Sequence, residues 1–234
     1  MQRLSVLATL FSLLIVSAAD GVLLDDFEDG NYTSNPTWSF APYTSGSQVL
    51  VTDDPVRPGN HVHAYRGTVD GHRGLDTSVD MPWAGFDFTT EYMASSAADF
   101  NPRFNIDGDG QIRIELRNYH SMQFQITEAG VTHSVSLADI PDNDWWSIHV
   151  WHAQGAGLIR GEIHRVADNS LVASLSFEPL VDYVSHAPIS HFRMVTQETQ
   201  WQYVDNICLT PEPSTALLLV AGLFIVGRRH HVAG

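Results

Sequence analysis

Residues 145 to 151, Trp-Trp-Ser-Ile-His-Val-Trp, hold the side chains of this sequence best suited to recognising a sugar. Successive side chains on a strand point to opposite faces. One face then holds Trp146, Ile148 and Val150, which we assign to the core. The other face holds Trp145, Ser147, His149 and Trp151. Flat aromatic surfaces with polar neighbours suit pyranose rings, so the pattern predicts a carbohydrate-binding face.

Charged side chains at alternate positions on other expected strands extend this face. They are Arg113, Glu115, Arg117, Arg160, Glu162, His164, His191 and Arg193. Such side chains are able to hold an acidic extracellular polysaccharide through charge-assisted hydrogen bonds. The alternative is that the tryptophans cover a second layer of loops and the charges solvate an open sheet.

The hypothesis that the protein is an enzyme depends on two short sequence motifs. Arg113-Ile114-Glu115-Leu116-Arg117 resembles the Arg-x-Glu-x-Arg strand of jelly-roll alginate lyases, which directs three polar side chains at substrate carboxylates. Glu162-Ile163-His164 is similar to the Gln-Ile-His element that carries the catalytic histidine of that family. The family's Tyr-x-Lys-Ala-Gly segment is missing, as is the Glu-x-Asp-x-x-Glu strand of jelly-roll glucanases. We therefore predict no catalytic residue, with a degenerate polysaccharide lyase or glycoside hydrolase as the alternative.

The residues named above must be positioned by short strands. The sequence indicates such strands by stretches in which apolar and polar residues alternate, separated by clusters of Gly, Pro, Asn and Asp. The expected strands are 22–27, 49–52, 61–66, 86–94, 112–116, 122–126, 145–151, 158–165, 171–177, 189–195 and 203–209. No segment of comparable length has a sustained helical period. Many short strands at this spacing predict an all-β sandwich or jelly roll.

Four runs carry a resemblance to a known fold. Residues 25–30, Asp-Asp-Phe-Glu-Asp-Gly, with Asn-Pro-Thr-Trp at 35–38, resemble the opening of concanavalin A-like, laminin-G-like jelly-roll domains in bacterial surface proteins. Residues 146–150 and 203–207 resemble the late core strand and the closing strand of these domains. The resemblance implies a jelly-roll sandwich of two antiparallel sheets.

Two metal sites follow as hypotheses. In such jelly rolls the first and last strands commonly lie together, which implies that Asp26 and Glu28 approach Asp205. Carboxylates suit Ca²⁺, so we predict a structural calcium site there; the alternative is solvated turn acids. His61 and His63 share one side of a strand and are either a metal pair or surface histidines.

The C-terminal residues predict where the protein is sorted. Pro211, Glu212 and Pro213, an apolar run at 216–227, and then Arg228 and Arg229 resemble the PEP-CTERM sorting signal of Gram-negative bacteria that make extracellular polysaccharide. The resemblance implies processing by an exosortase-type protease. About 12 apolar residues rise roughly 18 Å as a helix, short of the ~30 Å bilayer core. We therefore expect transient inner-membrane anchoring with the arginines in the cytoplasm; an ordinary C-terminal anchor is the alternative.

The N-terminus predicts export. Arg3, an apolar run at 4–16 and small residues at 17–19 are typical of a signal peptide, which signal peptidase would remove before Asp20. The predicted organisation is a signal peptide at 1–19, one jelly-roll domain at 20–210 and a sorting signal at 211–234.

The net charge and the cysteine content limit the classes of function that the sequence allows. The formal net charge is −15, which argues against nucleic acid as a partner. Cys208 is the only cysteine, so no intrachain disulfide forms, and we assign it as a small buried side chain. We predict an exported cell-surface or matrix protein that binds carbohydrate without catalysis or serves as a structural module. A protein–protein adhesin is a further alternative.

Overall fold

The computed structural model describes residues 23–34, 36–42, 48–66, 73–81, 85–95, 102–107, 112–118, 122–137, 141–152, 157–180, 189–196 and 200–211. The regular secondary structure in these residues consists of strands only, which are numbered β1 to β15. The predicted signal peptide, and the sorting signal beyond Pro211, lie outside the described residues. Within the described ranges no helix is long and apolar enough to span a membrane.

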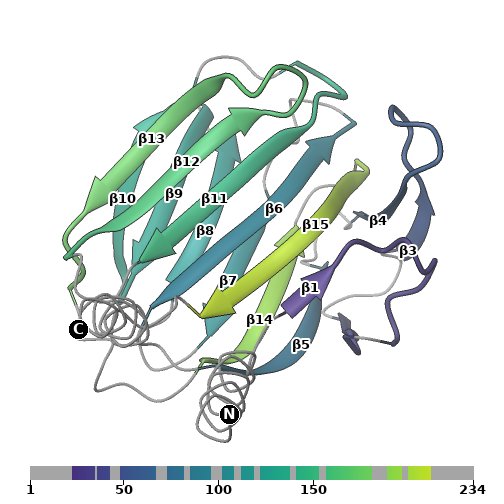
Figure 1. Ribbon diagram of the computed structural model, residues 1–234, viewed down its shortest axis with the longest axis horizontal. Helices are drawn as coiled ribbons and strands as arrows, with labels where there is room; N and C mark the ends of the chain where they lie inside the picture. Colours follow the sequence, from purple (N-terminus) through teal and green to yellow (C-terminus); the bar gives the residue numbers. More distant parts are fainter. Residues whose placement is uncertain are drawn as a thin grey trace, which may run out of the picture.

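The strands form two antiparallel sheets that pack face to face as two layers (Figure 1). The first is an eight-stranded sheet in which the last strand pairs on one side with β6 and on the other with β4 and the short β1. Its members, in spatial order, are β13 (Leu171–Phe177), β12 (Ile159–Arg165), β11 (Trp146–His152), β6 (Phe86–Ala94), β15 (Gln202–Pro211), β4 (His61–Arg66) and β3 (Gln48–Asp53), with β1 (Leu23–Asp25) beside β15.

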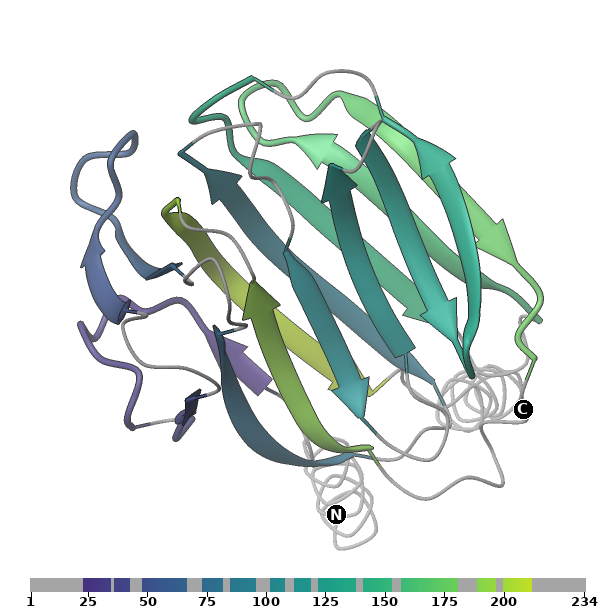
Figure 2. The ribbon, with the colours of Figure 1, turned by 180° about the vertical axis from the view of Figure 1, so that it is seen from behind.

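The second layer is a seven-stranded sheet, which faces the viewer in Figure 2. Its members, in spatial order, are β10 (Val131–Ser136), β9 (Met122–Glu128), β8 (Ile112–Asn118), β7 (Arg103–Asp107), β14 (Ile189–Thr196), β5 (Arg73–Met81) and β2 (Ser39–Pro42). Each sheet mixes early and late segments of the chain, so local sequence does not reveal which strands become neighbours.

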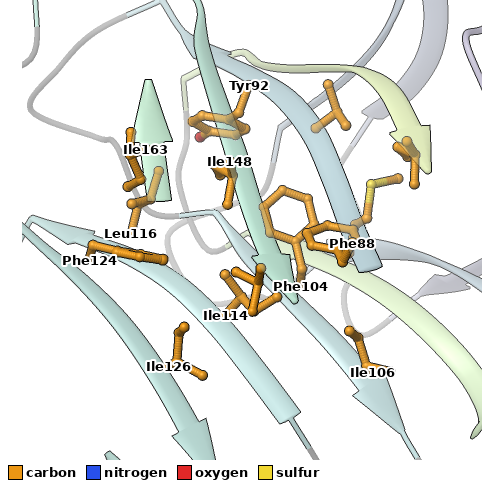
Figure 3. Packing of buried hydrophobic residues seen from close by; sticks show 14 of the residues in the cluster. Phe88, Tyr92, Phe104, Ile106, Ile114, Leu116, Phe124, Ile126, Ile148 and Ile163 are labelled. Atoms are coloured by element: carbon orange, nitrogen blue, oxygen red, sulfur yellow. The ribbon is translucent and has the colours of Figure 1, made fainter. Parts of the chain in front are cut away.

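The core lies between the two layers and is built from alternate residues of each strand. Phe88 of β6 and Phe104 of β7 are fully buried, and their ring centroids lie 5.5 Å apart across the layers (Figure 3). Ile114 and Ile148 reach the same core from β8 and β11. Each such side chain contributes about 1.5–3 kcal/mol through removal from water, and the intervening residues are left on the outer faces.

Most predicted strands are confirmed, and three of them, β4, β6 and β13, have the expected bounds. The sequence analysis missed β2, β5, β7 and β10. In β10 five of six side chains alternate between exposed and half-buried without a fully buried position, so the strand lacks the apolar signal that alternation needs. The predicted strand at 22–27 is shorter, because Phe27 has a positive φ of 56° and turns the chain.

Candidate functional site

Strand β11 divides its side chains as predicted. Trp146, Ile148 and Val150 are buried in the core, while His149 and Trp151 lie on the outer side of the eight-stranded sheet, half-buried. The imidazole of His149 stacks on the indole of Trp151, with ring centroids 4.2 Å apart and planes 23° apart. The stack forms a continuous flat aromatic surface on the outside of the sheet.

Polar side chains from the two neighbouring strands surround this stack. Asp87 of β6 contacts His149 through Oδ1 and Nε2, 3.0 Å apart. On β12, Glu162 pairs in register with His149 and Arg160 pairs with Trp151. Residues 87, 149, 151, 160 and 162 are called the aromatic face below. An aromatic plane ringed by carboxylate, imidazole and guanidinium groups offers an apolar contact and hydrogen-bonding partners together.

Trp145 does not belong to the aromatic face, so its predicted place beside His149 and Trp151 is wrong. The side chain is only 4% exposed. Its Nε1 donates to Oδ1 of Asp54 at 3.3 Å, and the guanidinium of Arg57 lies 4.0 Å from its ring. The loop between β3 and β4 covers this end of the outer sheet surface, as the alternative interpretation of a second layer proposed.

Arg57 fastens that loop through three carboxylates. It contacts Asp54 at 2.5 Å, Glu91 of β6 at 2.5 Å and Asp205 of β15 at 2.7 Å. Although burial opposes it, the hydrogen bonds from Arg57 and from the backbone of Val56 lower the pKa of Asp54. For Asp205 burial dominates and raises the pKa, against the hydrogen bond from Asn60 and the charge of Arg57. The network is therefore a structural clamp.

Arg113, Glu115 and Arg117 lie on β8, in the opposite sheet from the aromatic face. The prediction that they extend the same face as His149 and Trp151 is therefore wrong. Alternation within β8 was read correctly, because Ile112, Ile114 and Leu116 are in the core. The sheet to which the strand belongs was not readable, because it depends on pairing with β7 and β9. Side-chain placement of Arg117 lies outside the described residues.

On this second outer surface Glu115 holds two arginines. Its Oε1 accepts from Nε of Arg103 at 2.5 Å, and its Oε2 lies 3.1 Å from Nε of Arg113. The glutamate is 1% exposed, while the side chains of Arg103 and Arg113 are 27% and 39% exposed. The sequence analysis missed Arg103, since β7 was not predicted. The term arginine face is used below for residues 103, 105, 113, 115 and 193 with the adjoining polar residues 123, 125, 127 and 132.

The three acids predicted to bind calcium are engaged separately. Oδ1 of Asp26 accepts from the backbone N–H of Glu28. The Glu28 carboxylate accepts from the backbone N–H of His61 at 2.9 Å, and Asp205 contacts Arg57 and Asn60. Among the described residues, no group of three His, Cys, Asp or Glu side chains is arranged to hold a metal ion. In this arrangement the three carboxylates do not form one shared set of ligands.

The two histidines of β4 have different environments. His61 is half-exposed and lies 3.4 Å from both Glu28 and Asp53. His63 is buried between aromatic rings, with the centroids of Phe27 and Tyr65 each 5.3 Å away. Burial lowers the pKa of His63 from 6.5 to about 3. The interpretation of both as surface histidines is wrong for His63.

Two further predictions concern β15. Cys208 is a free, partly buried thiol whose pKa is raised by burial and by the charge of Asp87. Pro211, the first residue of the predicted sorting motif, is the last residue of β15 and pairs with Phe86. Glu212, Pro213, Arg228 and Arg229 lie outside the described residues.

No protein-family model matches the sequence, and no curated protein matches it significantly. Solved structures do share its fold. A peanut lectin structure has a TM-score of 0.54 at 9% identity, covering 82% of this chain and 98% of the lectin. The cellulose-induced protein Cip1 has a TM-score of 0.53 at 14% identity, with the same coverage. The VIP36 exoplasmic domain in its Ca²⁺/Man3GlcNAc-bound form has a TM-score of 0.50 at 8% identity, covering 74% of this chain and 85% of that domain.

At these identities the similarity establishes the fold. The described residues form a concanavalin A-like jelly roll of two antiparallel sheets, as the sequence predicted. Because one fold supports many activities, the function has to be argued from the two outer faces.

Proposed function

We propose that this chain is an exported, non-catalytic carbohydrate-binding protein of the cell surface or extracellular matrix, and that its aromatic face holds the sugar. The observation that carries the proposal is the parallel stack of His149 on Trp151, 4.2 Å between centroids, on the outer side of the sheet. Burial in the core does not account for this stack, because the inward positions of β11 are already filled by Trp146, Ile148 and Val150.

The chemistry of the surrounding groups fits sugar hydroxyls. The carboxylate of Asp87 and the imidazole of His149 fix each other's orientation at 3.0 Å. Glu162 is likewise oriented by His164, with Oε2 and Nε2 3.1 Å apart. Groups held in place before binding lose less entropy when a ligand arrives, so these side chains are suited to act as hydrogen-bond partners.

The fold comparison adds support. The similar structures include a peanut lectin and a VIP36 domain whose title names a bound Man3GlcNAc glycan. The identities of 9% and 8% carry no residue-level argument, so the proposal depends on the side chains of this chain.

Export and sorting complete the proposal. Signal peptidase would release the chain at Asp20, and an exosortase-type protease would act near Pro211-Glu212-Pro213 while Arg228 and Arg229 stay in the cytoplasm. Mass spectrometry of the protein recovered from a PEP-CTERM-processing Gram-negative cell measures both ends. A mature chain that retains residues 228 and 229 would contradict processing.

Calcium binding by Asp26, Glu28 and Asp205 remains a prediction. It requires Asp205 to exchange its contacts with Arg57 and Asn60 for the ion. Addition of calcium to chelator-treated protein tests this directly, because an ion bound only by the folded state raises the melting temperature.

The sugar proposal is tested by retention of the purified full-length protein on insoluble cellulose, mannan and galactan and on the extracellular polysaccharide of its source. Trp151→Ala is expected to weaken retention about tenfold or more, as loss of a buried-anchor tryptophan usually does. Leu171→Ala is the matched control, because this apolar residue is 56% exposed on the nearby strand β13.

The same mixtures are assayed for new reducing ends and unsaturated products. Retention without cleavage supports the binding proposal, whereas cleavage would favour the lyase or hydrolase alternative. Sugar-independent self-association with no retention would favour the adhesin alternative.

A further inference from the structure

We infer that the arginine face binds a carboxylated polysaccharide that lies across the strands of the seven-stranded sheet. This deepens the proposed function by naming a ligand class for a second site, and it depends on that function only in expecting a polysaccharide. The aromatic face and the arginine face belong to different sheets, so each can be tested without the other.

The first observation is a row of polar residues that crosses five strands. Successive pairings join Arg193 of β14 to Asn105 of β7, Asn105 to Arg113 of β8, Arg113 to Thr127 of β9, and Thr127 to Thr132 of β10. Because neighbouring strands lie ~4.8 Å apart, the row covers about 19 Å. A surface of this length suits an extended polymer better than a single small ion.

Neighbouring core residues show that this row faces outward. In β7, β8 and β9 the residues on either side, such as Phe104, Ile114 and Ile126, are fully buried in the core. Alternation therefore places 105, 113 and 127 on the opposite side of the sheet. The Oγ1 atoms of Thr127 and Thr132 lie 2.9 Å apart, and Nη2 of Arg113 donates to Thr127 at 3.4 Å. The polar groups thus share the outer side of the sheet, where Thr127 itself is only 7% exposed.

The second observation is the orientation of two guanidinium groups by Glu115. This buried carboxylate contacts the Nε atoms of both Arg103 and Arg113. In the described part of the chain, the terminal amino groups of Arg103 have no hydrogen-bond partner and those of Arg113 contact only Thr127. A planar guanidinium donates two parallel hydrogen bonds to a carboxylate, so the exposed ends of the pair are prepared for the carboxylates of uronic acid residues.

The third observation is charge. The chain as a whole carries −15, yet around Glu115 the two guanidinium groups of Arg103 and Arg113 exceed the single carboxylate, a local balance of 2 − 1 = +1. At physiological salt, charges more than ~8 Å away are largely screened. The local excess therefore determines which polymer this surface attracts. The amides of Gln123 and Gln125, bonded to each other at 2.7 Å, add partners for sugar hydroxyls.

Titration of the full-length protein with polygalacturonate, and with the same polymer after methyl esterification, tests the inference. We expect the free acid to bind at least tenfold more tightly than the ester and to lose affinity as salt rises. Arg113→Gln should weaken polygalacturonate binding at least tenfold. Arg165→Gln, the same charge change on the opposite sheet and outside both faces, should change it less than twofold. Dextran sulfate and dextran form a second pair that separates sulfate from carboxylate recognition.

Several results would overturn the inference: equal binding of acid and ester, tighter binding of dextran sulfate than of polygalacturonate, or equal losses in Arg113→Gln and Arg165→Gln. If Arg113→Gln fails to fold, Arg103→Gln and the acid–ester comparison on the unaltered protein give the same decision. The two sites fail separately, because Trp151→Ala should retain polygalacturonate binding and Arg113→Gln should retain binding to neutral polysaccharides.

Discussion

At the scale of single residues, two tryptophans six positions apart show how context changes the role of a side chain. Alternation places Trp145 and Trp151 on the same side of one strand, and both were predicted to contact sugar. Trp145 lies beneath Arg57 and is 4% exposed, while Trp151 stacks with His149 on the surface. The difference arises from the β3–β4 loop, which is distant in sequence and covers only one end of the sheet.

His63 gives a prediction for the pH dependence of stability. Burial lowers its pKa to about 3, whereas an unfolded chain keeps the ordinary value near 6.5. Below pH 6.5 the unfolded chain binds a proton that the folded protein does not, so the stabilisation present above 6.5 is lost as the pH falls towards 3. The loss is up to ~1.4 kcal/mol per pH unit, or about 2 kcal/mol between pH 7 and pH 5.

His63→Phe removes this effect, because a phenyl ring does not bind a proton. The substitution breaks no hydrogen bond, since the ring nitrogens of His63 have no hydrogen-bond partner in the described residues. Urea unfolding at pH 7 and pH 5 should show that the variant loses about 2 kcal/mol less than the parent protein. The comparison cancels contributions from other groups, such as Asp25, whose pKa is raised by burial. His61→Gln, which changes the half-exposed histidine of the same strand, serves as the control. Identical pH dependence of His63→Phe and the parent would show that His63 is not buried as a neutral ring.

At the scale of the elements, β12 approaches the opposite sheet through a residue without a side chain. A Cβ on Gly161 would lie 2.7 Å from the ring of Phe124 and 2.8 Å from Ile126 of β9. Real Cβ contacts are longer, so Gly161→Ala must displace core side chains at a cost of about 1–3 kcal/mol. Chemical denaturation measures the loss, with Ser176→Ala on the exposed side of β13 as the control. A loss below 0.5 kcal/mol, the size of a neutral surface change, would contradict this packing.

The loop that covers Trp145 gives a second prediction at this scale. Arg57→Gln leaves Asp54 and Asp205 buried without their cation. Removal of one partner of a fully buried pair costs 3–5 kcal/mol, but Arg57 is 30% exposed, so we expect about 1–3 kcal/mol. Arg160→Gln, on an exposed position of β12, should cost less than about 0.5 kcal/mol. Equal stability of the two variants in urea would show that the clamp contributes nothing.

Local alternation accounts for which elements were predictable. Strands β4, β6 and β13 alternate apolar and polar residues clearly, and their bounds followed from the sequence. Strand β7 has only Phe104 and Ile106 to mark its inner face, and β10 is mostly exposed. The contacts of these two strands, and with them Arg103, were therefore not foreseen.

Assignment of strands to sheets was the part that local sequence does not encode. Strand β11 pairs with β6, some sixty residues away, and with its neighbour β12, while β8 pairs in the other layer. This is why Arg113 and Glu115 were grouped with His149 and Trp151. The residue types and their outward orientation were predicted, but their division into two sites required the pairing of distant strands.

At the scale of the whole molecule, the two faces point away from each other, because they are the outer surfaces of two packed layers (Figures 1 and 2). One face combines aromatic rings with acids, and the other combines arginines with amides and hydroxyls. Under the two proposals above, the molecule would contact two polysaccharide chains on opposite sides.

The central claim is that the surface stack of Trp151 and His149 binds sugar. The most direct measurement is calorimetric titration of the full-length protein with oligosaccharides prepared from the extracellular polysaccharide of its source, repeated for Trp151→Ala and Leu171→Ala. We predict saturable binding that is at least tenfold weaker in Trp151→Ala at an unchanged melting temperature, and unaltered in Leu171→Ala. Absence of saturable binding, or identical isotherms for the parent and Trp151→Ala, would contradict the claim.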